Sequence, residues 1–142
     1  MNVKERFLKY ISVDTTSDPS SETFPSTKSQ LAFAADLEAE MKEMGLAEVS
    51  LDQYGYVFGT IPSTIPDYQG KILGFIAHMD TSSAASGANI SPRLIENYDG
   101  KDIVLHTEKN IIMRTKEFFQ SQSVSGTGFN CDGRSDPLRR GR

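Results

Sequence analysis

The chain has 142 residues, of which 37% are hydrophobic and 24% are charged, and its formal net charge at pH 7 is −4. This composition is typical of one soluble globular domain with a modest core, and it excludes a second full domain and extensive disorder. Because the balance of charge is acidic, we expect no nucleic acid and no anionic membrane surface as a partner.

The cysteine content and the N-terminus bear on the cellular compartment. Cys131 is the single cysteine and cannot form an intrachain disulfide, and Met1 to Arg6 lacks the apolar stretch of a signal peptide. The longest apolar run, Ile72 to Ala77, is far shorter than the roughly 20 residues that cross a bilayer. We therefore expect a cytoplasmic protein without a membrane span.

Two helices are predicted in the first third of the chain. Apolar residues at helical spacing predict a short amphipathic helix near residues 2 to 12 whose stripe faces a core, and they are Val3, Phe7, Leu8 and Ile11. A loop rich in Ser, Thr, Asp and Pro follows, from Ser12 to Ser26. The second helix is predicted to begin near Thr27 and to end at Gly45, which suits the left-handed position after a helix. Its broad apolar face comprises Leu31, Ala34, Ala35, Leu37, Met41 and Met44.

Three strands are predicted next. Val49 to Leu51 and Tyr56 to Ile61 form a hairpin in which Gly55 takes the strained turn position. The unbroken apolar run Ile72 to Ala77 is typical of a central strand that helices cover on both faces. These elements predict an α/β fold, in which ligands collect at the carboxyl ends of strands. His78 stands at such an end.

The sequence His78-Met79-Asp80 is a candidate metal corner. A ligating imidazole needs an acceptor on its second nitrogen, and a carboxylate two residues away can fix the tautomer and raise the basicity of the ring. On spacing alone the signal is weak, because a lone histidine at a strand end is more often a hydrogen-bonded structural residue.

The residues around this pair make the interpretation more specific. Gly74 to Ser82, followed by Ile95 to Gly100, resembles the peptidase T family, the aminotripeptidase branch of the zinc peptidases related to carboxypeptidase G2. The resemblance also covers Arg6 to Ile11, Ser26 to Gly45 and Gln53 to Val57, and it extends to about Phe118. It implies that residues 1–118 are the incomplete N-terminal part of a mixed-sheet zinc-peptidase catalytic domain.

The resemblance implies a zinc-dependent aminotripeptidase that removes the N-terminal residue from a short peptide substrate. It assigns His78 as a ligand of one of two zinc ions, and Asp80 as the catalytic-site carboxylate that orients it. The general-base glutamate, the bridging aspartate and the other ligands are missing from the matching part. One histidine cannot hold a catalytic zinc, so we expect this chain to be inactive alone. The alternative is a non-catalytic binding or scaffold fragment, in which His78 and Asp80 merely cap a strand.

Residues 119–142 differ in composition from the rest of the chain. Four of the seven arginines lie here, which fits either a disordered basic tail or an out-of-frame segment. Read one base later, codons available to residues 126–142 permit Thr-Asp-Gly and Leu-Leu-Gly-Ala-Asp, motifs of the family's bridging metal ligand. A slip at Phe118-Phe119 would produce this shift.

Several other features received the plainer interpretation. His106 is expected to be a surface histidine at a strand end, Cys131 is expected to be incidental, and Asp14 to Glu22 is expected to be a solvated acidic loop. A sheet without its later strands leaves an unpaired edge and exposed apolar surface, so we expect poor solubility and self-association or aggregation through that edge.

Overall fold

The computed structural model describes residues 1–107, 110–117 and 126–132. Its elements are α1 (Val3–Ile11), α2 (Lys28–Glu43), β1 (Ala47–Leu51), β2 (Val57–Thr60), β3 (Ser91–Tyr98), β4 (Ile103–His106), β5 (Ile111–Met113) and β6 (Gly126–Asp132). They divide between two compact units, one of residues 13–83 and one formed by residues 1–12 together with the rest of the chain from Ala84. The described residues contain no helix long and apolar enough to cross a membrane.

Helix α2 has clear start and stop signals. Thr27 is its N-cap, and Gln30 completes a capping box by accepting a hydrogen bond from the Thr27 N–H at 3.3 Å. Gly45 follows the helix with a φ of 80°, a conformation that residues with a Cβ rarely adopt. The predicted second helix is confirmed at both ends.

Strands β1 and β2 form the predicted antiparallel hairpin, with Leu51 opposite Val57. Gly55 is buried in the turn at a φ of 86°. One carboxylate oxygen of Asp52 accepts hydrogen bonds from the N–H groups of Tyr54 and Tyr56, both at 2.9 Å, so the turn is held by side chain and backbone together.

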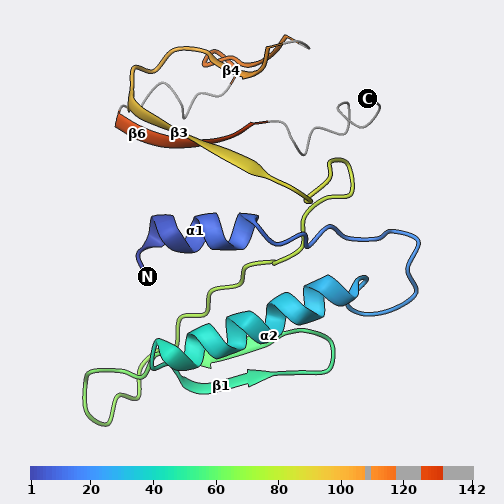
Figure 1. Cartoon of the computed structure of the whole chain (residues 1–142). Helices are drawn as coiled ribbons and strands as arrows, with labels where there is room; N and C mark the ends of the chain where they lie inside the picture. Colours follow the sequence, from blue (N-terminus) through green and yellow to red (C-terminus); the bar gives the residue numbers. More distant parts are fainter. Residues whose placement is uncertain (108–109, 118–125, 133–142) are drawn as a thin grey trace. The chain divides into compact units, whose positions relative to one another are not determined.

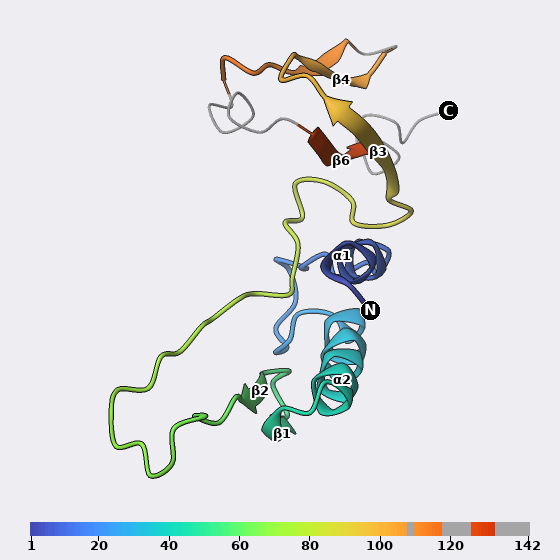
Figure 2. The same ribbon diagram turned by 90° about the vertical axis from the view of Figure 1, so that its left-hand side faces the viewer.

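Helix α2 packs against this hairpin (Figures 1 and 2). The small core of the unit contains Phe33 and Ala34, which are 5% and 0% exposed. On β2, a Cβ at Gly59 would lie 2.9 Å from Cδ2 of Leu46 and 3.3 Å from Sδ of Met41. A glycine at this position therefore permits close approach of the strand to the end of the helix.

The predicted central strand at Ile72 to Ala77 is wrong for the described structure. The segment is an open loop that runs away from α2 and the hairpin, drawn in yellow-green in Figure 2. Its large side chains are almost fully exposed: Ile72 97%, Leu73 77%, Phe75 90% and Ile76 101%. A buried strand needs hydrogen-bonding neighbours and covering helices, and the described residues of this unit place none beside it.

Helix α1 is confirmed in its extent. Asn2 caps it, with the Glu5 N–H donating to Oδ1 of Asn2 at 2.9 Å and the Asn2 N–H donating to a Glu5 carboxylate oxygen at 2.8 Å. The predicted burial of its apolar stripe is wrong, because no residue of α1 is buried and Val3 is 81% exposed. Periodicity specifies an amphipathic face, whereas burial depends on a partner that covers it.

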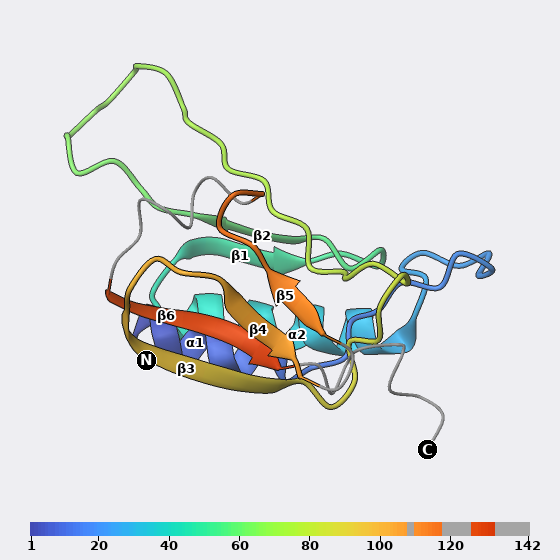
Figure 3. The ribbon, with the colours of Figure 1, turned by 90° about the horizontal axis from the view of Figure 1, so that it is seen from above.

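The remaining strands form two antiparallel pairs, β3 with β6 and β4 with β5 (Figure 3). In the described residues the strands therefore form three two-stranded sheets. The mixture of helix and strand agrees with the α/β prediction, but the mixed sheet that Ile72 to Ala77 was expected to join is not formed. Within the segment 119–142, the structure describes β6, whose backbone pairs with β3, and residues 118–125 and 133–142 lie outside the described residues. The reading frame of the segment stays a prediction.

Candidate metal centre

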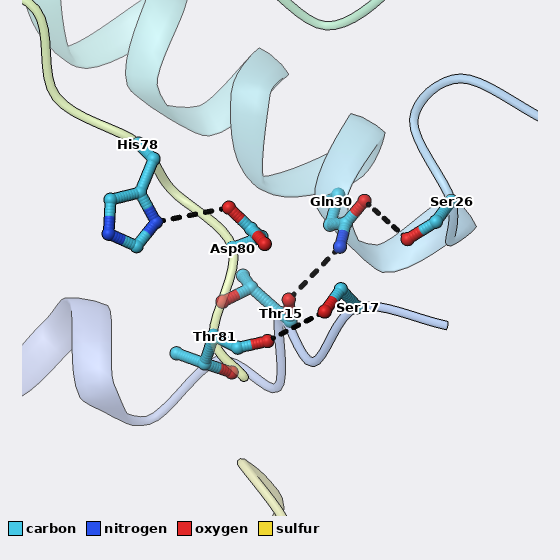
Figure 4. A network of polar contacts seen from close by, with 7 residues as sticks. All are labelled: Thr15, Ser17, Ser26, Gln30, His78, Asp80 and Thr81. Atoms are coloured by element: carbon cyan, nitrogen blue, oxygen red, sulfur yellow. Dashed lines mark hydrogen bonds and ion pairs between the residues drawn. The ribbon is translucent and has the colours of Figure 1, made fainter. Parts of the chain in front are cut away.

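His78 and Asp80 form a direct pair within the unit of residues 13–83. Nδ1 of the imidazole lies 3.0 Å from Oδ1 of the carboxylate, as Figure 4 shows. The side chains are 84% and 46% exposed, so the pair is open to solvent. Because Asp80 occupies Nδ1, the other ring nitrogen, Nε2, remains as the atom able to bind a metal.

The backbone just after this pair is fixed by the loop that precedes α2. The Thr81 N–H donates to the carbonyl of Thr15 at 3.2 Å, and the Ser17 N–H donates to the carbonyl of Thr81 at 2.9 Å. The Ser17 hydroxyl also donates to the Thr81 carbonyl at 3.1 Å. These bonds make a parallel bridge between Thr16 and Thr81, which anchors the end of the segment that carries His78 and Asp80.

A buried amide supports this bridge. Gln30, in the first turn of α2, is 4% exposed, and its Nε2 donates to the Thr15 carbonyl at 3.2 Å (Figure 4). Its Oε1 accepts from the Ser26 hydroxyl at 3.3 Å. Ser26 in turn accepts a hydrogen bond from the Asp18 N–H at 3.0 Å. The loop of residues 14–26 is therefore tied to both α2 and Thr81.

Asp18 is the carboxylate in this loop with a perturbed titration. The Ser20 hydroxyl donates to Oδ1 of Asp18 at 2.6 Å and the Ser20 N–H donates to the same oxygen at 2.9 Å. These two hydrogen bonds, the hydroxyl first, lower the pKa of Asp18 below its ordinary value. Asp18 therefore keeps its negative charge further into the acid range than a free aspartate. The loop expected to be solvated is buried at Thr15, which is 3% exposed.

The described residues fit one position of a zinc site and not a whole site. An imidazole with Nδ1 held by a carboxylate matches the usual arrangement of a zinc-bound histidine. No cluster of three or more His, Cys, Asp or Glu side chains able to hold a metal ion occurs within the ranges that the structure describes. A closed zinc site needs about four ligands and a catalytic site about three, so this corner requires further ligands.

His106 differs from its expected position. It is 4% exposed, so the predicted surface histidine is wrong. The pairing of β4 with β5 shifts register between Val104 and His106, and such an irregularity disrupts the alternation of inward and outward side chains. His106 lies on β4, which belongs to a different unit from the one that contains His78.

Comparison with known proteins points to one enzyme family, although no protein-family model matches the chain. Peptidase T from Halothermothrix orenii is 51% identical over 124 residues, which cover 87% of this chain and 30% of the relative. Peptidase T from Clostridium botulinum strain Loch Maree is 56% identical over 117 residues, covering 82% and 28%. The chain is homologous to peptidase T. It spans about 30% of the length of these peptidase T relatives.

Sequence reasoning placed His78 and Asp80 together but missed Gln30 and Thr15. Thr15 was placed in a polar loop, and Gln30 was not among the residues of the apolar face of the second helix, yet both are buried. One signal was available for Gln30: in Thr27-Lys28-Ser29-Gln30, the glutamine stands three residues after a threonine, the spacing of a capping box. No local pattern in the sequence indicated the bond from Gln30 to Thr15.

Proposed function

We propose that this chain is part of a zinc-dependent aminopeptidase that removes the N-terminal residue from tripeptides. The observation that carries the proposal is the hydrogen bond from His78 to Asp80, which leaves Nε2 open, in a chain at least half identical to peptidase T over most of its length. The single cysteine fits a cytoplasmic location.

In this proposal His78 offers the Nε2 lone pair as one metal ligand. Asp80 accepts a hydrogen bond from the Nδ1 N–H, which keeps the neutral ring in the tautomer whose Nε2 can bind a metal. The hydrogen bond between Thr81 and Thr15 fixes the backbone beside the pair. The imidazole and Asp80 are therefore already positioned, and metal binding does not have to order this segment first. When bound, a zinc pair supplies polarisation of the peptide carbonyl and activation of a water molecule.

The proposal includes that the 142-residue chain alone is inactive. It contributes one candidate imidazole ligand, and a catalytic site needs about three protein ligands and an open position. The test is a tripeptide hydrolysis assay with added zinc, run on this chain and on a form extended to the length of its relatives. The extended form should cleave tripeptides and lose activity on His78→Ala. Activity of the short chain, or an active extended His78→Ala variant, would overturn the assignment.

A second function, a non-catalytic binding fragment, is favoured by one observation. The exposed apolar segment Ile72 to Ile76 is uncharged, has no proline and is rich in β-forming residues, which is the pattern of strands that pair with another chain. We propose that this segment also drives self-association of the isolated chain. Metal binding separates the two functions, because a scaffold has no need of an open Nε2 at His78.

A further inference from the structure

The buried side chain of Gln30 has hydrogen-bond partners on both its amide oxygen and its amide nitrogen. Its amide oxygen faces two donors, the Ser26 hydroxyl and the Thr27 N–H, both at 3.3 Å, and its amide nitrogen faces the carbonyl of Thr15 at 3.2 Å. A buried polar group without partners is costly, so a glutamine that is 4% exposed keeps this orientation.

The carbonyl of Thr15 joins two distant segments. It accepts one hydrogen bond from Gln30 Nε2 and another from the Thr81 N–H, each at 3.2 Å, using the two lone pairs of one oxygen. Thr15 is itself 3% exposed, so water competes little for this oxygen. A chain of hydrogen bonds therefore runs from the first turn of α2 through Thr15 to Thr81, the residue that follows Asp80. Figure 4 shows its first bond, from Gln30 to Thr15.

We propose that Gln30 is a positioning residue for the candidate metal centre. Through Thr15 it fixes the peptide between Asp80 and Thr81, and thereby the direction from which Asp80 meets Nδ1 of His78. The inference rests on the proposed function for its link to a metal, and its structural part stands on the hydrogen bonds alone. The hydrogen bonds of Gln30 described above join it to Ser26, Thr27 and Thr15 rather than to His78 or Asp80, so it acts through the backbone.

The test compares three variants of the full 142-residue chain. Gln30→Leu removes the donor and the acceptor. Gln30→Glu keeps an acceptor for Ser26 and Thr27 and replaces the donor to Thr15 with a carboxylate oxygen that faces the Thr15 carbonyl. Ala34→Gly is the matched control, because Ala34 is 0% exposed in the same helix and its replacement weakens α2 without removing any atom of the network.

Two readouts separate positioning from general loss of stability. Amide hydrogen exchange at Thr81 should be about fivefold faster in both Gln30 variants than in Ala34→Gly, the effect of losing one net hydrogen bond. The ¹⁵N chemical shifts of the His78 ring should move in the Gln30 variants and stay unchanged in Ala34→Gly. Equal exchange at Thr81 in all three variants, or an unchanged His78 ring in the Gln30 variants, overturns the proposal.

A zinc titration of the wild-type chain, carried to a large excess of zinc because one imidazole binds the ion weakly and followed at the same ring, tests the proposed function separately. If zinc leaves His78 unchanged while the Gln30 variants alter Thr81 exchange and the His78 ring, the positioning role stands and the metal assignment fails. If zinc binds at His78 and the Gln30 variants behave as Ala34→Gly does, the metal assignment stands and the positioning role fails.

Discussion

Nδ1 of His78 lies 3.0 Å from Oδ1 of Asp80, although the two side chains are 84% and 46% exposed. In water such a pair gains little from attraction between charges, so its main effect is on which ring nitrogen holds the proton. The pair therefore fixes the tautomer of the ring more than it stabilises the fold.

Replacing Asp80 should change the tautomer of His78. In Asp80→Ala the acceptor for the Nδ1 proton is lost, so the neutral ring loses its preference for that tautomer. The ¹⁵N chemical shifts of the two ring nitrogens at a pH above the imidazole titration measure the change. Glu38→Ala, which removes a carboxylate paired with Lys42 on α2, is the control and should leave the ring unchanged. The prediction is contradicted if Asp80→Ala also leaves the His78 shifts unchanged.

A charge placed in the exposed apolar segment should weaken self-association. In Ile76→Lys, a side chain that is 101% exposed becomes charged, so the folded chain loses no packing but an intermolecular strand pair would have to bury a charge. The association constant should fall by at least about tenfold, because burial of one isoleucine contributes about 1.5–3 kcal/mol. Sedimentation velocity over a range of concentrations measures it.

Ile61→Lys is the matched control for that experiment, because Ile61 is 82% exposed and lies outside the segment. It should leave association nearly unchanged. Equal effects of the two substitutions would assign self-association to general surface hydrophobicity, and a monomeric wild-type chain would remove the proposal altogether.

The β4–β5 pair should lose stability in acid. The Thr115 N–H donates to Oδ1 of Asp102 at 2.9 Å, and this bond is the largest cause that lowers the pKa of Asp102 below 3.8. Because the pKa of Asp102 is lowered in the folded state, the stability that its ionised carboxylate contributes is complete above pH 3.8. That stability is lost as the pH falls through the folded pKa. Exchange of the Thr115 amide, followed from pH 6 down to about pH 2.5, measures it.

Asp102→Asn supplies the control for the acid prediction. It removes the titrating group while keeping an oxygen that can accept from Thr115, so the local loss of protection below pH 3.8 should disappear. Persistence of the same acid dependence in Asp102→Asn would assign it to another carboxylate.

The reading frame of residues 119–142 can be tested on the coding DNA. If the segment is out of frame, the other frame beyond Phe118 should read Thr-Asp-Gly and then Leu-Leu-Gly-Ala-Asp. The curated relatives match 117 to 124 residues of the chain, which leaves part of it outside the similarity. DNA without these motifs in the other frame would show that the segment is encoded as written.

Local signals predicted the local elements. The cap at Thr27 and the left-handed glycines at Gly45 and Gly55 act within a few residues, so the sequence places the second helix and the hairpin turn. Apolar residues at helical spacing place the first helix. The His78–Asp80 contact was also predictable, because only Met79 separates the two residues and the carboxylate reaches the ring without any other element.

Burial was harder to predict, because it depends on what covers a residue. Ile72 to Ala77 has the composition of a core strand and is exposed, whereas Gln30 and Glu40 are polar and are 4% and 6% exposed. The three cases share a cause. The hydrophobicity of a side chain sets whether burial is favourable, but the residue is buried only if neighbouring elements cover it.

A zinc titration of the ¹⁵N-labelled chain, followed at the histidine ring nitrogens, tests the central claim most directly. The chain has two histidines, and the buried His106 serves as an internal reference for His78. Because a single imidazole ligand binds the ion weakly, the titration is carried to a large excess of zinc. Zinc should then shift Nε2 of His78, leave His106 unchanged, and bind about tenfold to a hundredfold more weakly in Asp80→Ala. A His78 signal that zinc does not move, or zinc binding that Asp80→Ala leaves unchanged, would contradict the assignment of this pair as a metal ligand and its orienting carboxylate.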